Sequence, residues 1–127
     1  MALPPCHVLY QFIVDTTSRL LHLCMYQRSC DSYLGIPFNI ASASLFLEIM
    51  AKLTGYTAGT YTHFLADAHI YINHVDKVKH QLTLQPKPLP TLGFSKRHFT
   101  IDSIMPEDIQ LCEYDPHKWD SSAPMAV

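Results

Sequence analysis

The 127-residue sequence has no excess of basic residues, few charged residues of either sign, and no Gly-rich phosphate-binding loop. Nine Lys and Arg stand against eleven Asp and Glu, which gives a formal net charge of −2 with the eight histidines neutral. Such a chain offers no electrostatic footprint for nucleic acid, so we do not expect DNA as a partner. An acidic ligand would have to be held locally, by one or two well-placed arginines.

The sequence also lacks a signal peptide, because no basic segment followed by an apolar segment occurs at its start. The longest apolar stretch, 40–53, contains Glu48 and Lys52, so we do not expect it to span a membrane. Hydrophobic residues nevertheless make up 48% of the chain, which is enough to fill a core and argues against disorder. One globular domain is the expectation for this length.

Cysteine and histidine motifs are missing as well. The four cysteines are Cys6, Cys24, Cys30 and Cys112. They form no CxxC pair, which favours reduced thiols in a cytoplasmic protein over a disulfide framework. His69 and His74 are five residues apart, and the chain has no HxxxH motif or Cys/His cluster, so we expect no metal site.

Hydrophobic periodicity predicts an α+β fold. Residues 7–14 and 20–27 alternate and are joined by the polar stretch 15–19, which predicts an antiparallel hairpin. Both faces of the hairpin are largely apolar, so we expect helices or a second sheet to cover both sides. The other predictions are a loop over 28–39, a buried helix over 40–54 ending near Gly55, a loop or short strand over 56–68, a helix over 70–82, short strands over 91–94 and 98–101, and a tail over 115–127.

Taken singly, the polar residues of the chain have ordinary structural explanations. Cys6 follows two prolines, and a lone cysteine is most often a small buried hydrophobic residue. Arg28 and Asp31 are close enough in sequence to form a solvated ion pair. Asn39 lies where an asparagine could cap the start of the predicted helix. Tyr71 fits the apolar stripe of the second helix.

Four motifs change this interpretation when they are taken together. The strings LPPCH, YQRSCD, LGIPFNIAS and DAHIYINH, followed by the closing MAV, occur in this order from Met1 to Val127. In this combination the chain resembles thymidylate synthase over its whole length. The resemblance implies a thymidylate synthase-like α+β fold, with a β-sheet packed against helices. Residues 1–127 would then be an incomplete domain, the carboxy-terminal portion of the catalytic domain, beginning just before the nucleophile.

The resemblance also implies a function. The expected protein is a methyltransferase of nucleotide biosynthesis that converts dUMP to dTMP with 5,10-methylenetetrahydrofolate. It would act in the cytoplasm as a homodimer. Cys6 matches the nucleophile, whose thiolate adds to uracil C6. The residues that match the dUMP site are Gln27, Arg28, Ser29, Asp31, Asn39, His69 and Tyr71. Those that match the folate site are Asp31, Gly35, Ala126 and Val127.

The chemistry of these residue types agrees with the implied roles. An arginine fork pairs with phosphate through two N–H groups, and the Ser29 hydroxyl can donate a further hydrogen bond. An amide can accept from uracil N3–H and donate to uracil O4 at once, so Asn39 favours dUMP. An aspartate at that position would suit cytosine, as in the related dCMP hydroxymethylases. His69 and Tyr71 match the pair that binds the deoxyribose 3′-hydroxyl at a strand-to-helix junction.

The sequence departs from the family in several places. Ala66 stands where the family usually has glycine, the stretch 15–19 is about two residues longer than in many relatives, and the residues before MAV are unusual. The family's catalytic glutamate, part of its folate pocket and the phosphate-binding arginines lent by a dimer partner have no counterpart in these 127 residues. We therefore expect a half-enzyme that needs an amino-terminal half. The alternatives are an inactive fragment acting as a dimerisation or regulatory partner, and a dUMP hydroxymethylase.

Overall fold

The structure is a computed structural model that describes residues 3–95, 100–118 and 123. The chain divides into two compact units, one formed by residues up to Val75 and the other by residues from Asp76 onward. The first unit holds a three-stranded sheet and a long helix. The second holds a short helix and a two-stranded sheet. The predicted mixture of helices and strands is confirmed.

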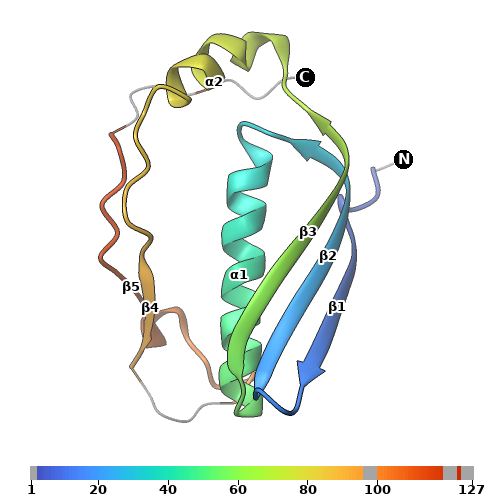
Figure 1. The fold of residues 1–127 in the computed structure, drawn as a ribbon, viewed down its shortest axis with the longest axis vertical. Coiled ribbons are helices and arrows are strands. Elements are labelled where there is room, and N and C mark those ends of the chain that lie inside the picture. Colours follow the sequence, from blue (N-terminus) through green and yellow to red (C-terminus); the bar gives the residue numbers. More distant parts are fainter. Residues whose placement is uncertain (1–2, 96–99, 119–122, 124–127) are drawn as a thin grey trace. The chain divides into compact units, whose positions relative to one another are not determined.

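The sheet of the first unit has the strand order β1-β2-β3 (Figure 1). Strands β1 (His7–Asp15) and β2 (Leu20–Asp31) pair antiparallel, so the predicted hairpin is confirmed. The helix α1 (Gly35–Thr54) leads from β2 to β3 (Thr57–His69), which pairs parallel to β2. A parallel pair requires such a crossover, and here it places α1 on one face of the sheet.

Helix α1 begins five residues earlier than predicted, at Gly35 rather than at residue 40. The prediction of a loop over 28–39 was wrong because β2 continues to Asp31 and the chain turns at once into the helix. Pro37 fits the first turn, where backbone N–H groups have no intrahelical partner. The predicted end is confirmed, because Gly55 adopts a left-handed conformation with φ of 74° and caps the helix.

The core of the first unit lies between β2 and α1. The buried hydrophobic residues there are Leu21, Leu23 and Met25 of the strand and Ala43, Leu47 and Ala51 of the helix. Phe46 adds edge-to-face contacts with Tyr10 and Phe12 of β1, at ring-centroid distances of 5.8 and 5.3 Å. By length and composition alone α1 could cross a membrane. One face of the helix, with Ala43, Leu47 and Ala51, packs against the sheet.

The opposite face of the sheet was predicted to be covered, and this prediction was wrong for the described part of the chain. Leu9, Ile13, Tyr26 and Phe64 are between 44% and 53% exposed. A groove of about 510 Å³ runs along this face between β1, β2 and β3. We call this apolar surface the open face.

Strand β3 is much longer than the predicted loop or short strand over 56–68. Its residues Thr60 and Thr62 are exposed, while Tyr61 and His63, which alternate with them, are half-buried. Many of its residues are small or polar, so the alternating pattern was weak in sequence. The pairing with β2 shifts register between Leu21 and Leu23, and this irregularity lies at Gly59.

The chain between β3 and the second unit is less helical than predicted. A 3-10 helix, η1 (Ile72–His74), precedes a seven-residue helix, α2 (Val75–Gln81), so the predicted helix over 70–82 is confirmed only in part. In the second unit β4 (Thr91–Phe94) confirms the predicted strand and pairs antiparallel with β5 (Ile109–Cys112), which follows η2 (Pro106–Asp108). The other predicted strand, 98–101, was wrong where it is described, because Ile101 lies in a turn.

Candidate functional site

Cys6 lies just before β1 and its side chain is exposed. The adjacent part of β2 holds its segment in place. The backbone N–H of Arg28 donates to the Cys6 carbonyl at 2.9 Å, and its Nε donates to the Pro5 carbonyl at 3.1 Å. Its Nη2 donates to the Pro4 carbonyl. Arg28 is therefore hydrogen-bonded to the backbone of the segment that carries Cys6.

Arg28 keeps capacity for a ligand after these contacts. A guanidinium carries five N–H donors, and the carbonyls of Pro4 and Pro5 take two of them. The alternative of an ion pair with Asp31 is wrong within the described residues. The Asp31 Oδ1 atom instead accepts from the backbone N–H groups of Tyr33 and Leu34, at 3.0 and 3.3 Å. Asp31 thus stabilises the turn into α1.

Gln27 and Asn39 are joined directly. Gln27 is only 2% exposed, and its Nε2 donates to Asn39 Oδ1 at 2.9 Å and to the Ser29 carbonyl at 2.8 Å. Asn39 is the fifth residue of α1, and the N-cap position belongs to Leu34. The alternative of Asn39 as a helix cap is therefore wrong. Two residues assigned to the nucleotide site meet although they are twelve positions apart.

His63 contacts the same glutamine, and it was not predicted from the sequence to be a site residue. Its Nε2 lies 2.9 Å from Gln27 Oε1, on the side of the amide away from Asn39. Burial lowers the pKa of His63, and the nearby His7 lowers it further. The only sequence signal was its alternation with Tyr61, in a stretch that was predicted as a loop or short strand.

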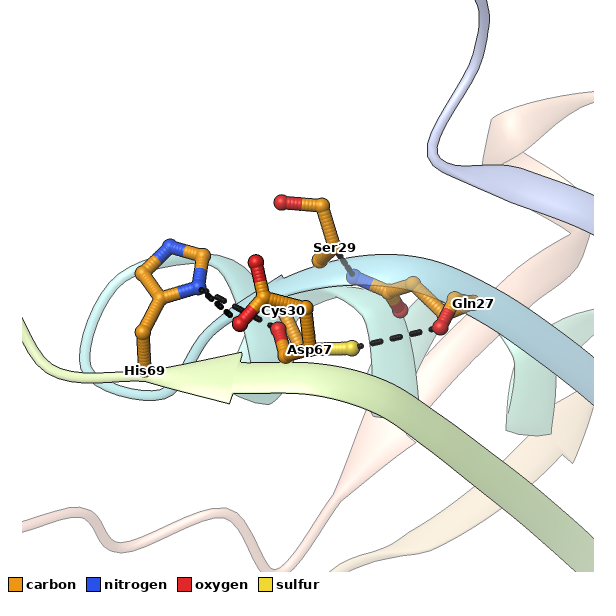
Figure 2. Close-up of polar contacts among 5 residues, drawn as sticks. All are labelled: Gln27, Ser29, Cys30, Asp67 and His69. Atoms are coloured by element: carbon orange, nitrogen blue, oxygen red, sulfur yellow. Dashed lines mark hydrogen bonds and ion pairs between the residues drawn. The ribbon is translucent and has the colours of Figure 1, made fainter.

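Two thiols near this site differ in character. Figure 2 shows Cys30 beside Gln27 and Ser29, with its Sγ donating to the Gln27 carbonyl at 3.6 Å. Cys30 is fully buried, and this burial raises the pKa of its thiol. It therefore fits the description of a structural cysteine, whereas Cys6 is open to a substrate. All four cysteines of the chain are free thiols.

His69 and Tyr71 lie together at a strand-to-helix junction, as predicted. His69 is the last residue of β3, Tyr71 immediately precedes η1, and their rings meet edge to face with centroids 5.1 Å apart. The His69 Nδ1 atom lies 3.2 Å from the Asp67 carbonyl and 3.7 Å from its carboxylate (Figure 2). The backbone N–H of Ser32 donates to the His69 carbonyl at 2.9 Å, which fastens this junction to the end of β2.

The residues assigned to folate are described only in part. Gly35 opens α1, and a Cβ there would lie 3.3 Å from the Asp31 Cβ and 3.7 Å from Asn39 Oδ1. Gly35 is thus packed between Asp31, which is assigned to both sites, and Asn39, which is assigned to the nucleotide site. Ala126 and Val127 lie outside the described residues. No group of three His, Cys, Asp or Glu that could hold a metal ion occurs among the residues that the structure describes.

The topology explains why these residues gather. Parallel strands β2 and β3 end at the same edge of the sheet, where Asp31 pairs with His69. Strand β1 is antiparallel, so its start meets that edge, and His7 pairs with Gln27. The described candidates therefore share one sheet edge. It presents an exposed thiol, a guanidinium, a fixed amide and a histidine–tyrosine pair.

Comparison with known proteins agrees with this arrangement. The family model for thymidylate synthase matches residues 1–127. The chain belongs to the thymidylate synthase family. The thymidylate synthase of Symbiobacterium thermophilum is 51% identical over 117 residues, and that of Mycoplasma mobile is 45% identical over 117 residues. Each match covers 92% of this chain but only 41% and 40% of the relative. This thymidylate synthase family chain thus spans about two fifths of the length of the curated relatives it matches.

Proposed function

We propose that this chain supplies the nucleophile and the dUMP-binding edge of a thymidylate synthase. The observation that carries the proposal is the gathering of Cys6, Arg28 and Asn39 at one edge of the sheet, linked by the contacts described above. The reaction is the methylation of dUMP to dTMP, with 5,10-methylenetetrahydrofolate as cosubstrate. Family membership supports the class of reaction.

The proposed chemistry follows from the weakness of uracil C5 as a nucleophile. Addition of the Cys6 thiolate to uracil C6 makes C5 enolate-like, so that C5 attacks the methylene of the folate. Loss of the C5 proton and cleavage of the bond between the methylene and the folate nitrogen would leave an exocyclic methylene. Hydride transfer from the folate to this carbon and elimination of Cys6 would then give dTMP and dihydrofolate. The remaining N–H groups of Arg28 would hold the phosphate, with Ser29 beside them. Asn39 would pair with uracil N3–H and O4, while His69 and Tyr71 would bind the 3′-hydroxyl.

We propose that residues 1–127 are the carboxy-terminal portion of the catalytic domain and work with an amino-terminal half. The coverage of about two fifths of each relative supports this. Helix α1 also exposes apolar side chains, with Phe38 74% and Ile40 44% exposed. The folate would contact Asp31 and Gly35 from this chain, together with Ala126 and Val127. The missing half would supply the rest of the folate pocket.

We further propose a cytoplasmic homodimer in which a second copy covers the open face. Its groove is lined by Val8, Leu9, Gln11, Cys24, Met25, Tyr26 and Phe64. A contiguous apolar face on a sheet is typical of a protein–protein contact. The dimerising surface of the family supports a second copy of this chain as the partner.

The test measures dTMP formed from dUMP and methylenetetrahydrofolate. The purified chain alone should form none, because a thiol acceptor without its proton-handling partner is slow. Addition of the amino-terminal half should restore turnover, and the product mass separates a methyl from a hydroxymethyl group. Robust turnover by the chain alone would refute the need for a second half. No turnover with both halves present would favour the inactive fragment.

A further inference from the structure

A series of hydrogen bonds between three side chains connects the interior of the sheet to Asn39, the candidate base-binding amide. His63 of β3 contacts Gln27 of β2, and Gln27 contacts Asn39 of α1, each at 2.9 Å. The three residues come from three different elements. Any change in the orientation of the Gln27 amide therefore affects its contacts with both His63 and Asn39.

The direction of each hydrogen bond follows from chemistry. The Ser29 carbonyl can only accept, so the atom of Gln27 that faces it at 2.8 Å is the NH2 group. The oxygen of Gln27 must then face His63, which donates through Nε2–H. The same NH2 group meets Asn39, so the atom of Asn39 at that contact is its oxygen. The polarity of both amides is thereby determined.

His63 is suited to act only as a donor to Gln27. Its other ring nitrogen, Nδ1, is buried and has no hydrogen-bond partner among the residues that the structure describes. A proton on Nδ1 would be an unsatisfied buried donor, which is costly. The neutral tautomer with the proton on Nε2 is therefore the form that the surroundings favour.

We propose that His63 is a positioning residue that, through Gln27, holds the Asn39 amide in the orientation that binds uracil rather than cytosine. The inference rests on the proposed function, in which Asn39 binds the base. With one lone pair of its oxygen used by Gln27, Asn39 retains a second lone pair for uracil N3–H and an NH2 group for uracil O4. An inverted amide would present a donor to N3 and an acceptor to N4, which is the pattern that cytosine requires.

Removal of the N–H donor of His63 should weaken the preference for uracil over cytosine. Gln27 Oε1 would become a buried acceptor without a partner, and rotation of Gln27 toward another donor would release Asn39. The replacement His63→Phe keeps an aromatic ring but has no N–H. The replacement His63→Gln keeps an N–H group near the position of Nε2. The matched control Tyr61→Phe removes a hydroxyl from the same strand. This hydroxyl donates to Met25 Sδ at 3.9 Å and not to Gln27.

The experiment measures dUMP and dCMP affinity by titration calorimetry, with this chain assembled with its amino-terminal half. The wild type should prefer dUMP. His63→Phe should reduce the preference on the order of tenfold, whereas His63→Gln and Tyr61→Phe should stay within about threefold of the wild type. Ring 15N shifts of the nucleotide-free wild type should also show the proton of His63 on Nε2.

The outcomes separate this inference from the proposed function. A wild type that prefers dUMP, with an unchanged preference in His63→Phe, overturns the role of His63 and leaves the proposed function intact. A wild type that binds neither nucleotide contradicts the proposed function itself, and the inference with it. Equal losses in His63→Phe and His63→Gln would also overturn it, because a donor at this position would then be irrelevant.

Discussion

The side-chain amide of Gln27 donates a hydrogen bond to the side-chain oxygen of Asn39, across the interface between the central strand and the helix. Gln27 is almost completely buried, whereas Asn39 is half-buried at the edge of the sheet. The contact therefore ties a group that can meet a ligand to the rigid interior. Binding residues held in this way lose little freedom when a ligand binds.

The base preference should change with Asn39→Asp. A carboxylate still accepts from Gln27, so we expect the fold to survive, but it has no N–H for uracil O4 and suits the amino group of cytosine. The loss of the matching hydrogen bond should weaken dUMP binding by ~1–3 kcal/mol and improve dCMP binding. Calorimetric titration with both nucleotides measures the shift. Asn73→Asp, at an exposed position, is the control and should leave both affinities unchanged.

Phosphate binding should depend on Arg28 and not on arginine in general. Arg28→Ala should weaken dUMP binding about 10- to 100-fold, because a charged hydrogen bond contributes ~1.5–3 kcal/mol. Binding of deoxyuridine, which lacks the phosphate, should change much less. Arg19→Ala is the control, since Arg19 contacts the Gly55 carbonyl and the Tyr56 ring. A similar loss for both ligands in Arg28→Ala would mean that Arg28 only holds the segment before Cys6.

Stability should respond to a methyl group at Gly59 far more than at Gly93. A Cβ at Gly59 would lie 2.7 Å from the His22 ring and 3.1 Å from the Leu21 carbonyl, at the register shift between β2 and β3. A Cβ at Gly93 would meet Cys112 Sγ at 3.5 Å, an ordinary contact. Gly59→Ala should lower the free energy of unfolding by ~1–3 kcal/mol. Denaturant unfolding measures both variants, and equal effects would refute the close packing at Gly59.

The pH dependence of stability should carry a contribution from His63. Burial holds its pKa below the ordinary value, so the unfolded chain binds more protons than the folded chain near that value. The contribution is fully present above about pH 6.5, the ordinary histidine pKa, and is lost progressively as the pH falls below it. The free energy of unfolding of His63→Gln should therefore fall less between pH 7 and pH 5 than that of the wild type. If the free energy of unfolding changed equally with pH in the two proteins, a lowered pKa of His63 would be contradicted.

The sequence predicted the elements whose signals are local. Alternation over residues 7–14 and 20–27 predicted β1 and β2, and Gly55 predicted the end of α1. The start of α1 was missed because Gly35 and Pro37 are typical of loops. The Asp31 side chain stabilises the turn directly before them, through the backbone N–H groups of Tyr33 and Leu34.

The rest depended on contacts between distant residues. Strand β3 was underestimated because its many Thr, Ala and Gly residues gain strand structure only by pairing with β2. The site residues themselves were found through the family resemblance, and the structure places the described ones at one edge. The role of His63 required knowledge of which atom of Gln27 it meets, and no spacing in the sequence contains that information.

The central claim is that Cys6 is the nucleophile that activates dUMP, and tritium release from [5-³H]dUMP tests it most directly. Replacement of the hydrogen at C5 must release tritium to water. With the amino-terminal half and methylenetetrahydrofolate present, the wild-type chain and a Cys112→Ala control should release tritium at similar rates. Cys6→Ala should release none above background. Release by Cys6→Ala at the wild-type rate would contradict the account.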